Sequence, residues 1–170
     1  MTDGPASNPD KNEFRKVFGH LPTGVVVVTG RAVSGEPHGI TIGSFVSISL
    51  EPQLAGFFIG RSSRTWPLIA ARGTFTANVL NATQAELCWR FAKDATDGSR
   101  FTGLQVGTSA NGSPVLPDVV ATIDCTVHTS HVVGDHDLVV GAVTDVQARN
   151  TSHPSMVFYK GKTGDARIDT

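Results

Sequence analysis

Charge of either sign is scarce in this sequence and is not segregated along the chain. Lys and Arg number 14 and Asp and Glu 15 in 170 residues, which gives a formal net charge of -1 and a pI near 6.6. Proteins that hold a nucleic-acid backbone usually carry a clustered excess of Lys and Arg. Because the basic residues here are scattered, we expect no nucleic-acid partner.

Long apolar runs and cysteines are also scarce. No run approaches the ~20 residues of a membrane-spanning helix, and MTDGPASNPDKNEF at the start lacks the basic and apolar blocks of a secretory signal. Only two cysteines, Cys88 and Cys125, are present, and no CxxC occurs, so neither a disulfide framework nor a redox pair is indicated. We expect a cytoplasmic protein with two reduced thiols and no membrane contact.

Several signatures of chemistry are missing as well. No HExxH occurs, GTSAN at 107–111 has Asn where a nucleophile elbow needs Gly, and no GxGxxG follows a strand. His128 and His131 could join Asp135 and His136 at a metal, but their odd spacing places the first two on opposite faces of a strand. We therefore expect no metal site and no Rossmann nucleotide site.

What the sequence does contain is a series of short β-type runs. Each is rich in β-branched or aromatic residues and is bounded by turn residues: VVVVTG (25–30), LAGFFIG (54–60), FTANVL (75–80), VVATIDCTVHTSHVV (119–133), LVVGAVTDVQ (138–147) and MVFY (156–159). Because helices do not alternate regularly with these strands, we expect a mainly antiparallel sheet closed on itself as a small β-barrel.

Short helical segments separate some of these strands. We expect helices near Phe14–Leu21, over PLIAAR (67–72) and over TQAELCWRFAK (83–93), the last opened by a capping box of Thr83 and Glu86. Residues 94–118 are polar and rich in Gly, which indicates a long surface loop. The expected organisation is a tail (1–12), one domain (13–162) and a second tail (163–170).

The stretch HGITIGSFVSISLEP (38–52) reads as one strand with two unlike faces. Even positions 40–50 supply mainly Ile, Val and Leu, which predicts a core face. The odd face has Thr, Gly, Phe and Ser but no charged side chain, although exposed strands usually carry Lys or Glu. Two interpretations remain open from the strand alone: a Ser/Thr-rich face in water, or a face covered by a ligand.

Two polar segments are candidates for anion binding. In GRSSRTWPL (60–68), hydroxyls and arginines precede a predicted helix, which suits a phosphate, although Ser or Thr at this place is often a plain helix cap. In GDHD (134–137), His136 lies at a strand turn, where it is either an anion or proton-transfer group or an ordinary surface histidine.

Taken together, these segments resemble the short-chain flavin reductases, a family with an antiparallel, Greek-key split β-barrel that binds FMN. The resemblance covers about residues 14–160 in the family's order. It is carried by PTGVVVVTG (22–30), HGITIGSFVSISLEP (38–52), GRSSRTW (60–66), FTANVL (75–80) with the helix ending RFA, GSPVL (112–116) and IDCTV continuing to GDHDLVVGAV.

The resemblance implies a set of cofactor-binding residues. The ring and ribityl chain of a flavin would lie against the hydroxyl face, the phosphate on GRSSRTW, and the end of the RFA helix would enclose the flavin. The implied residues are Gly39, Ile40, Thr41, Gly43, Ser44, Ser47, Ser63, Arg64, Thr65, Arg90 and Phe91, with His136 and Tyr159 at the nicotinamide. Gly43 departs from the family, which commonly has Asn, Ala or Ser there, and no aromatic follows Gly161.

The implied activity is hydride transfer from NADH or NADPH to FMN or FAD, in a homodimer that supplies reduced flavin to a separate monooxygenase. Since the flavin provides the electronic chemistry, we expect no essential catalytic acid, base or nucleophile. Two alternatives remain: a split-barrel flavoprotein that retains FMN and reduces another acceptor, and a flavin-binding electron carrier without a productive nicotinamide site.

Overall fold

The valine run at 25–28 lies between two separate cores. In the computed structural model, which describes residues 8–93, 95–150 and 152–167, strand β2 (Val26–Arg31) is buried on both faces over most of its length. Side chains alternate along a strand, so Val25 and Val27 join one apolar cluster while Val26 and Val28 join the other. This double burial explains why the run has no polar residue in alternate positions.

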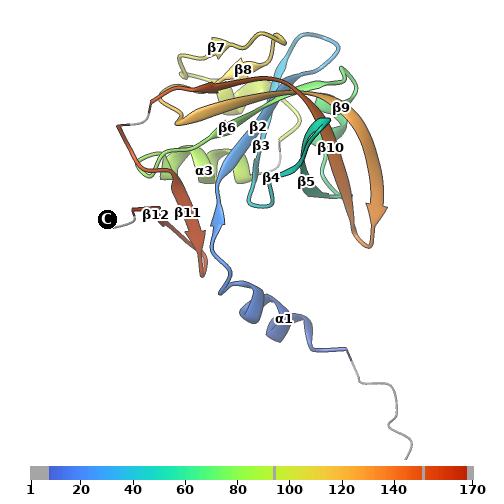
Figure 1. Ribbon diagram of the computed structural model, residues 1–170, viewed down its shortest axis with the longest axis vertical. Helices are drawn as coiled ribbons and strands as arrows, with labels where there is room; N and C mark the ends of the chain where they lie inside the picture. Colours follow the sequence, from blue (N-terminus) through green and yellow to red (C-terminus); the bar gives the residue numbers. More distant parts are fainter. Residues whose placement is uncertain (1–7, 94, 151, 168–170) are drawn as a thin grey trace, which may run out of the picture.

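Strand β2 belongs to a seven-stranded antiparallel sheet that forms the body of the molecule (Figure 1). The order across the sheet is β3-β2-β6-β9-β10-β5-β4. The bounds of the other strands are β3 (Pro37–Ile42), β4 (Val46–Leu50), β5 (Gln53–Gly60), β6 (Thr74–Val79), β9 (Ala121–Val133) and β10 (His136–Ala148). The predicted mainly β, antiparallel character is confirmed.

The two edges of this sheet approach each other but do not pair. Strands β3 and β4 are consecutive in the chain yet lie at opposite edges, and only residues 43–45 join them. A link this short spans at most ~14 Å, so the sheet has to curl. Within the described residues the edges β3 and β4 share no backbone pairing, so the prediction of a sheet closed on itself is wrong.

The prediction of a single strand over 38–52 is also wrong, because the strand breaks at Gly43. Ile42 is buried, as the predicted core face requires. In β4, however, the residues at the same even positions are exposed: Val46 is 55%, Ile48 46% and Leu50 85% exposed. The edge strand β4 therefore presents an apolar face that the chain itself does not cover.

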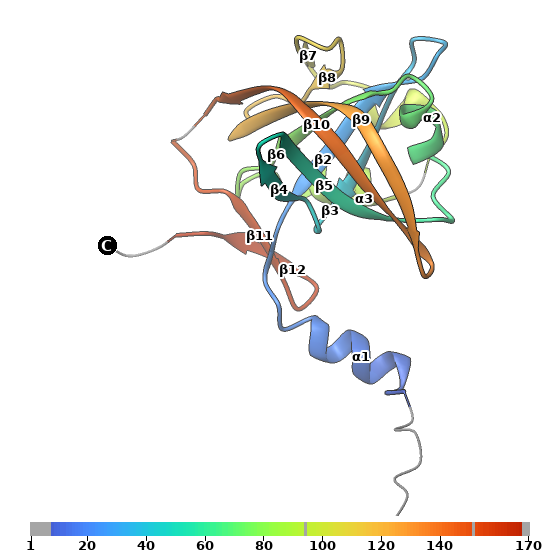
Figure 2. The same cartoon turned by 45° about the vertical axis from the view of Figure 1, so that its right-hand side comes forward.

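Three smaller strands and the first helix extend from the body (Figures 1 and 2). Strands β1 (Thr23–Gly24), β11 (Met156–Tyr159) and β12 (Lys162–Asp165) form a separate antiparallel sheet. Helix α1 (Lys11–Phe18) projects below this sheet and has no buried residue. Its Phe14 and Phe18 stack with ring centroids 4.3 Å apart while both stay exposed.

The remaining helices lie against the large sheet. They are α2 (Trp66–Ala70), α3 (Ala85–Ala92) and the 3-10 helix η1 (Gly98–Phe101). The capping box predicted for α3 is wrong, because its N-cap is Gln84, without a side-chain capping bond. Instead, the Asn81 side chain accepts from the Thr83 backbone N–H, and the Gln84 side chain accepts from the Asn81 backbone N–H.

Residues 95–118 are more ordered and more buried than the predicted surface loop. They contain η1 and the hairpin of β7 (Gly107–Thr108) and β8 (Pro114–Val115). Thr29 Oγ1 donates to the Pro114 carbonyl at 2.6 Å, and Leu116 N–H donates to Asn78 Oδ1 at 2.9 Å. These bonds from buried sheet residues attach the segment to the body.

Candidate functional site

A cavity of about 280 Å³ lies where the end of β3 meets α3. Thr41 Oγ1 donates to the Cys88 carbonyl at 2.8 Å, which joins the strand to the helix. The walls are mainly apolar, and three of the predicted cofactor-binding residues lie in them. The lining residues are Val25, Ile40, Thr41, Ile42, Gly43, Cys88, Trp89, Ala92 and Phe158.

Small residues keep this region open. A Cβ at Gly43 would lie 3.1 Å from Thr23 Oγ1, so the backbone approaches β1 closely there. Gly39 is buried, and Phe91 is fully buried beneath it, so Phe91 supports the cavity wall from behind rather than lining it. Cys88 is buried as well, and burial raises the pKa of its thiol, which keeps it protonated at neutral pH.

The predicted hydroxyl face divides between two places. Ser44 Oγ accepts from the Phe58 N–H at 2.9 Å and is 3.3 Å from the Phe58 carbonyl. This hydroxyl therefore attaches the link between β3 and β4 to strand β5. Ser47 instead lines a second, mainly apolar hollow of about 320 Å³ with Phe45, Leu54 and Val143. The structure therefore does not place Ser47 in the β3–α3 cavity wall that contains Thr41.

The predicted phosphate segment lies between β5 and α2. Ser63 Oγ accepts from the Trp66 N–H at 3.2 Å, at the first residue of α2, whereas the N-cap residue Thr65 makes no side-chain capping bond to the helix. Thr65 is fully buried, and its hydroxyl donates to the Ala95 carbonyl at 2.9 Å. Arg64 is exposed. Because α2 is only five residues long, side chains rather than a helix dipole have to supply the attraction for an anion here.

A third hollow, of about 670 Å³, lies on the outer side of α3. Arg90 and Lys93 contribute positive charge, and the Arg90 guanidinium donates to the Thr102 carbonyl at 2.5 Å. Trp89 lines this hollow and the β3–α3 cavity, so the indole lies between an apolar site and a cationic one. The remaining lining residues are Glu86, Ala95, Ser99 and Arg100.

His136 and Tyr159 lie on different hairpins. His136 begins β10 opposite Gly60, so it adjoins the phosphate segment, and its Nδ1 is 2.7 Å from Asp135 Oδ1. That hydrogen bond is the main cause that lowers the pKa of Asp135. Tyr159 is on β11, with its ring centroid 6.5 Å from that of His20. The hairpin ends are apart in both views (Figures 1 and 2).

The sequence model of one family, described as "Flavin reductase like domain", matches residues 18–167. The chain belongs to this flavin reductase-like family. It is 42% identical over 155 residues to a flavin reductase of Pseudomonas putida, a match that covers 91% of this chain and 89% of that protein.

Solved structures of the family have the same fold. Nitrilotriacetate monooxygenase component B from Mycobacterium thermoresistibile superposes with a TM-score of 0.86 at 34% identity, over 93% of this chain and 87% of that chain. The NADH:FAD oxidoreductase SgcE6 of Streptomyces globisporus C-1027, in complex with NAD and FAD fragments, gives 0.86 at 30% identity, over 98% and 99% of the two chains.

Across the described residues, no three or more His, Cys, Asp and Glu side chains group as they would around a metal ion. No helix in the described part of the chain is both long and apolar enough to cross a bilayer.

Several residues of the site were not identified from the sequence. Cys88 and Ala92 are four residues apart and therefore share the face of α3 that lines the cavity, a helical spacing that was available as a signal. Trp89 is three residues before Ala92, so the same helical spacing places it beside the cavity. Phe158 and Arg100 carry no such local signal, because each reaches the site through long-range packing.

Proposed function

We propose that this protein transfers hydride from NADH or NADPH to FMN or FAD and supplies the reduced flavin to a separate monooxygenase component. The observation that carries the proposal is the β3–α3 cavity, where Ile40, Thr41 and Gly43 meet Cys88 and Trp89. Family membership and the names of the relatives, a flavin reductase and a monooxygenase component among them, support the same reaction.

The residues present fit a flavin. A flat aromatic ring system needs an apolar cleft without bulky side chains, together with a few polar groups at its edge. Ile40 and Gly43 supply the first, and Thr41 and the backbone of β3 supply the second. Gly39 and Ser44 lie next to these residues in the chain, Gly39 against Phe91 and Ser44 bonded to Phe58. In this proposal Ser63, Arg64 and Thr65 form the phosphate segment, Arg90 encloses the flavin from the end of α3, and Phe91 supports the enclosing wall from behind. Ser47, which lines the separate hollow beside β4, contributes only if the flavin extends that far.

The protein's own contribution is positioning. When bound, flavin supplies the two-electron acceptor, so the chain needs no acid, base or nucleophile of its own for the hydride step. The walls of the cavity hold the acceptor, exclude water and leave one face for the nicotinamide, because hydride transfer requires close and aligned reactants. We assign His136 and Tyr159 to nicotinamide binding.

We further propose that the protein is a homodimer and that a second copy completes the nicotinamide site. Two apolar surfaces support the dimer: the outward face of β4, with Val46 and Ile48, and the projecting helix α1, with Phe14 and Phe18. Exposed apolar area of this kind is typical of interfaces. His136 begins β10 and Tyr159 ends β11, and the ends of the β9–β10 and β11–β12 hairpins lie apart in both views (Figures 1 and 2), which supports a site that residues of two copies share.

We also propose a cytoplasmic location. Both cysteines are free and buried, which agrees with a reducing compartment.

The test is steady-state oxidation of NADH and NADPH with and without added FMN or FAD, after a visible spectrum of the purified protein. Oxidation that saturates with added flavin supports a reductase that uses flavin as a substrate. A protein that retains its flavin and reduces another acceptor would point to the first alternative, and one that is inactive with either nucleotide would point to an electron carrier.

A matched pair of variants locates the reaction. Ile40→Trp fills the β3–α3 cavity and should abolish flavin-dependent oxidation. Val33→Trp places the same side chain at a position that is 77% exposed and should leave oxidation unchanged. Equal activity of the two variants would exclude this cavity as the flavin site.

A further inference from the structure

Arg100 is a buried arginine at the junction of three elements that line the proposed flavin site. It lies on η1 and is 6% exposed. Its Nη1 donates to the carbonyls of Phe91 at 3.3 Å and Lys93 at 2.6 Å, where α3 ends. The last carbonyls of a helix lack partners within the helix, so the guanidinium caps α3.

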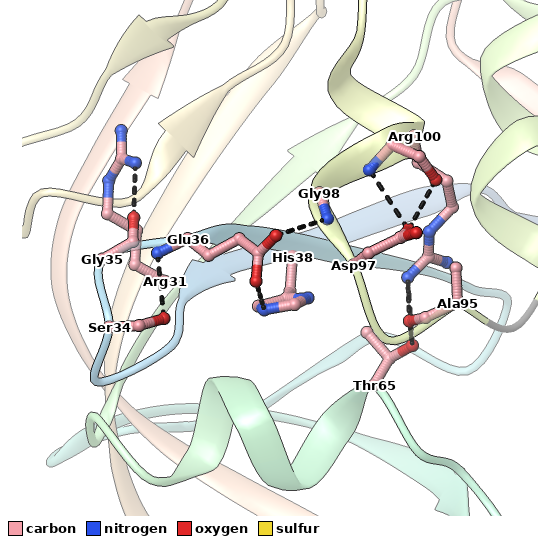
Figure 3. Close-up of polar contacts among 11 residues, drawn as sticks. Arg31, Ser34, Gly35, Glu36, His38, Thr65, Ala95, Asp97, Gly98 and Arg100 are labelled. Carbon is pink, nitrogen blue, oxygen red and sulfur yellow. Dashed lines mark hydrogen bonds and ion pairs between the residues drawn. The ribbon is translucent and has the colours of Figure 1, made fainter.

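The other side of the guanidinium reaches the phosphate segment. Nη2 donates to Thr65 Oγ1 at 3.0 Å and to the Ala95 carbonyl at 3.0 Å (Figure 3). Thr65 Oγ1 in turn donates its proton to the same Ala95 carbonyl at 2.9 Å. The hydroxyl proton of Thr65 is therefore already used within the protein, and this side chain fixes the segment rather than donating to a phosphate.

The turn that carries Arg100 is itself held in place. Gly98 N–H, at the start of η1, donates to Glu36 Oε1 at 2.9 Å, and Glu36 Oε2 lies 3.8 Å from Nε2 of the buried His38 (Figure 3). Arg100 also lies 5.7 Å from the centroid of the Phe91 ring, which packs under Gly39. One guanidinium thus links the phosphate segment, the end of α3 and the support of β3.

We propose that Arg100 is a positioning residue for the flavin phosphate. By holding Thr65 it sets the backbone that carries Ser63 and Arg64, and its positive charge lies one hydrogen bond from that segment. A group fixed by several hydrogen bonds holds a binding segment more accurately than a flexible loop can. This inference rests on the proposed function, because it assigns the segment to a flavin phosphate.

The experiment compares two flavins that differ only in the phosphate. FMN and riboflavin are titrated by fluorescence against the full chain and against Arg100→Met, Arg100→Lys, Thr65→Val and Thr65→Ser. Arg31→Met is the matched control, because Arg31 also donates to backbone carbonyls, those of Gly112 at 3.1 Å and Gly35 at 3.0 Å, and neither glycine is a proposed flavin residue.

The expected result is selective. The wild-type chain binds FMN more tightly than riboflavin, and Arg100→Met and Thr65→Val weaken FMN binding roughly tenfold while riboflavin changes less than threefold. Thr65→Ser keeps the hydroxyl and retains most of the FMN affinity. Arg31→Met leaves the ratio of the two affinities unchanged. Thermal unfolding confirms that each variant is folded, and if Arg100→Met does not fold, the Thr65 pair decides.

Three results would overturn the inference. One is an equal loss of FMN and riboflavin affinity in the folded Arg100 and Thr65 variants, and another is no loss of either. The third is equal affinity of the wild-type chain for the two flavins, since no phosphate subsite would then exist. Flavin-dependent NADH oxidation by the wild-type chain would still stand in all three cases, so these failures are distinct from a failure of the proposed function.

Discussion

Phe91 lies directly against Gly39, so β3 cannot carry a side chain at that position without displacing the ring. A Cβ at Gly39 would be 2.9 Å from Cδ1 and Cε1 of Phe91, and the ring is fully buried. We predict that Gly39→Ala destabilises the protein by about 1–3 kcal/mol, the usual cost of overpacking, and weakens flavin binding.

The control for this prediction is Gly24→Ala. A Cβ at Gly24 would meet no atom within 4 Å, so the unfolding free energy should change little. Urea unfolding of both variants measures the difference. Similar stability of Gly39→Ala and Gly24→Ala would show that Phe91 can move aside and that the contact does not restrict β3.

His38 should make the stability depend on pH. Burial is the largest influence and lowers the pKa of His38 from 6.5; the charges of Glu36 and Asp97 oppose this, and that of Arg100 adds to it. The folded state therefore favours neutral His38. As the pH falls through about 6.5, the unfolded chain binds a proton that the folded chain does not, so the unfolding free energy decreases.

The measurement is urea unfolding at pH 7.5 and 5.5. His38→Gln removes the titrating group from the buried site and should reduce the loss of stability at the lower pH. His153→Gln, at an exposed position, should leave that loss as in the wild-type chain. An unchanged loss in His38→Gln would assign the pH dependence to other groups.

The positions of several strands could be predicted from the sequence, because local residue preferences and the turn residues around them agree with the final structure. VVVVTG, LAGFFIG and FTANVL correspond to β2, β5 and β6 because β-branched and aromatic residues favour strands and Gly or Pro bounds them. The hairpin β9–β10 follows from long apolar runs on either side of Gly134.

The break at Gly43 was not predicted, although Ser44 interrupts the apolar row of even positions and Phe45 is apolar on the odd face. The Ser44 hydroxyl accepts from the backbone N–H of Phe58, a role that a backbone carbonyl would have in a continuous strand. Alternation reports which side chains share a face, but it does not report at which edge of a sheet a strand pairs. The pairing of β4 with β5 instead of with β3 leaves one face of β4 exposed and the edges β3 and β4 unpaired.

The candidate site, too, could be predicted only in part. The resemblance to the family identified Ile40, Thr41 and Gly43, which the structure places in one cavity. The hydrogen bonds that fix their surroundings connect residues far apart in the chain, such as Thr65 with Arg100 and Thr41 with Cys88. Those pairings depend on tertiary structure and leave no local pattern.

His136 should affect nicotinamide binding more than the chemical step. Its Nδ1 is held by Asp135 at 2.7 Å, which leaves Nε2 for a ligand. We predict that His136→Ala raises the KM for NADH roughly tenfold, about 1.4 kcal/mol, with a much smaller change in kcat. His131→Ala, on the same hairpin, should change neither constant. A fall in kcat with unchanged KM would instead place His136 in the hydride step.

The apolar face of β4 should control the oligomeric state. Ile48 is 46% exposed on an edge strand, and a charged side chain in a buried interface is strongly unfavourable. We predict that the wild-type chain sediments at twice its mass of 17.9 kDa and that Ile48→Glu sediments as a monomer. Val33→Glu, on the turn between β2 and β3, should remain a dimer. If Ile48→Glu also remained a dimer while Phe18→Glu did not, the interface would lie on α1 and the partner copy would approach beside Tyr159 rather than across the unpaired edges β3 and β4.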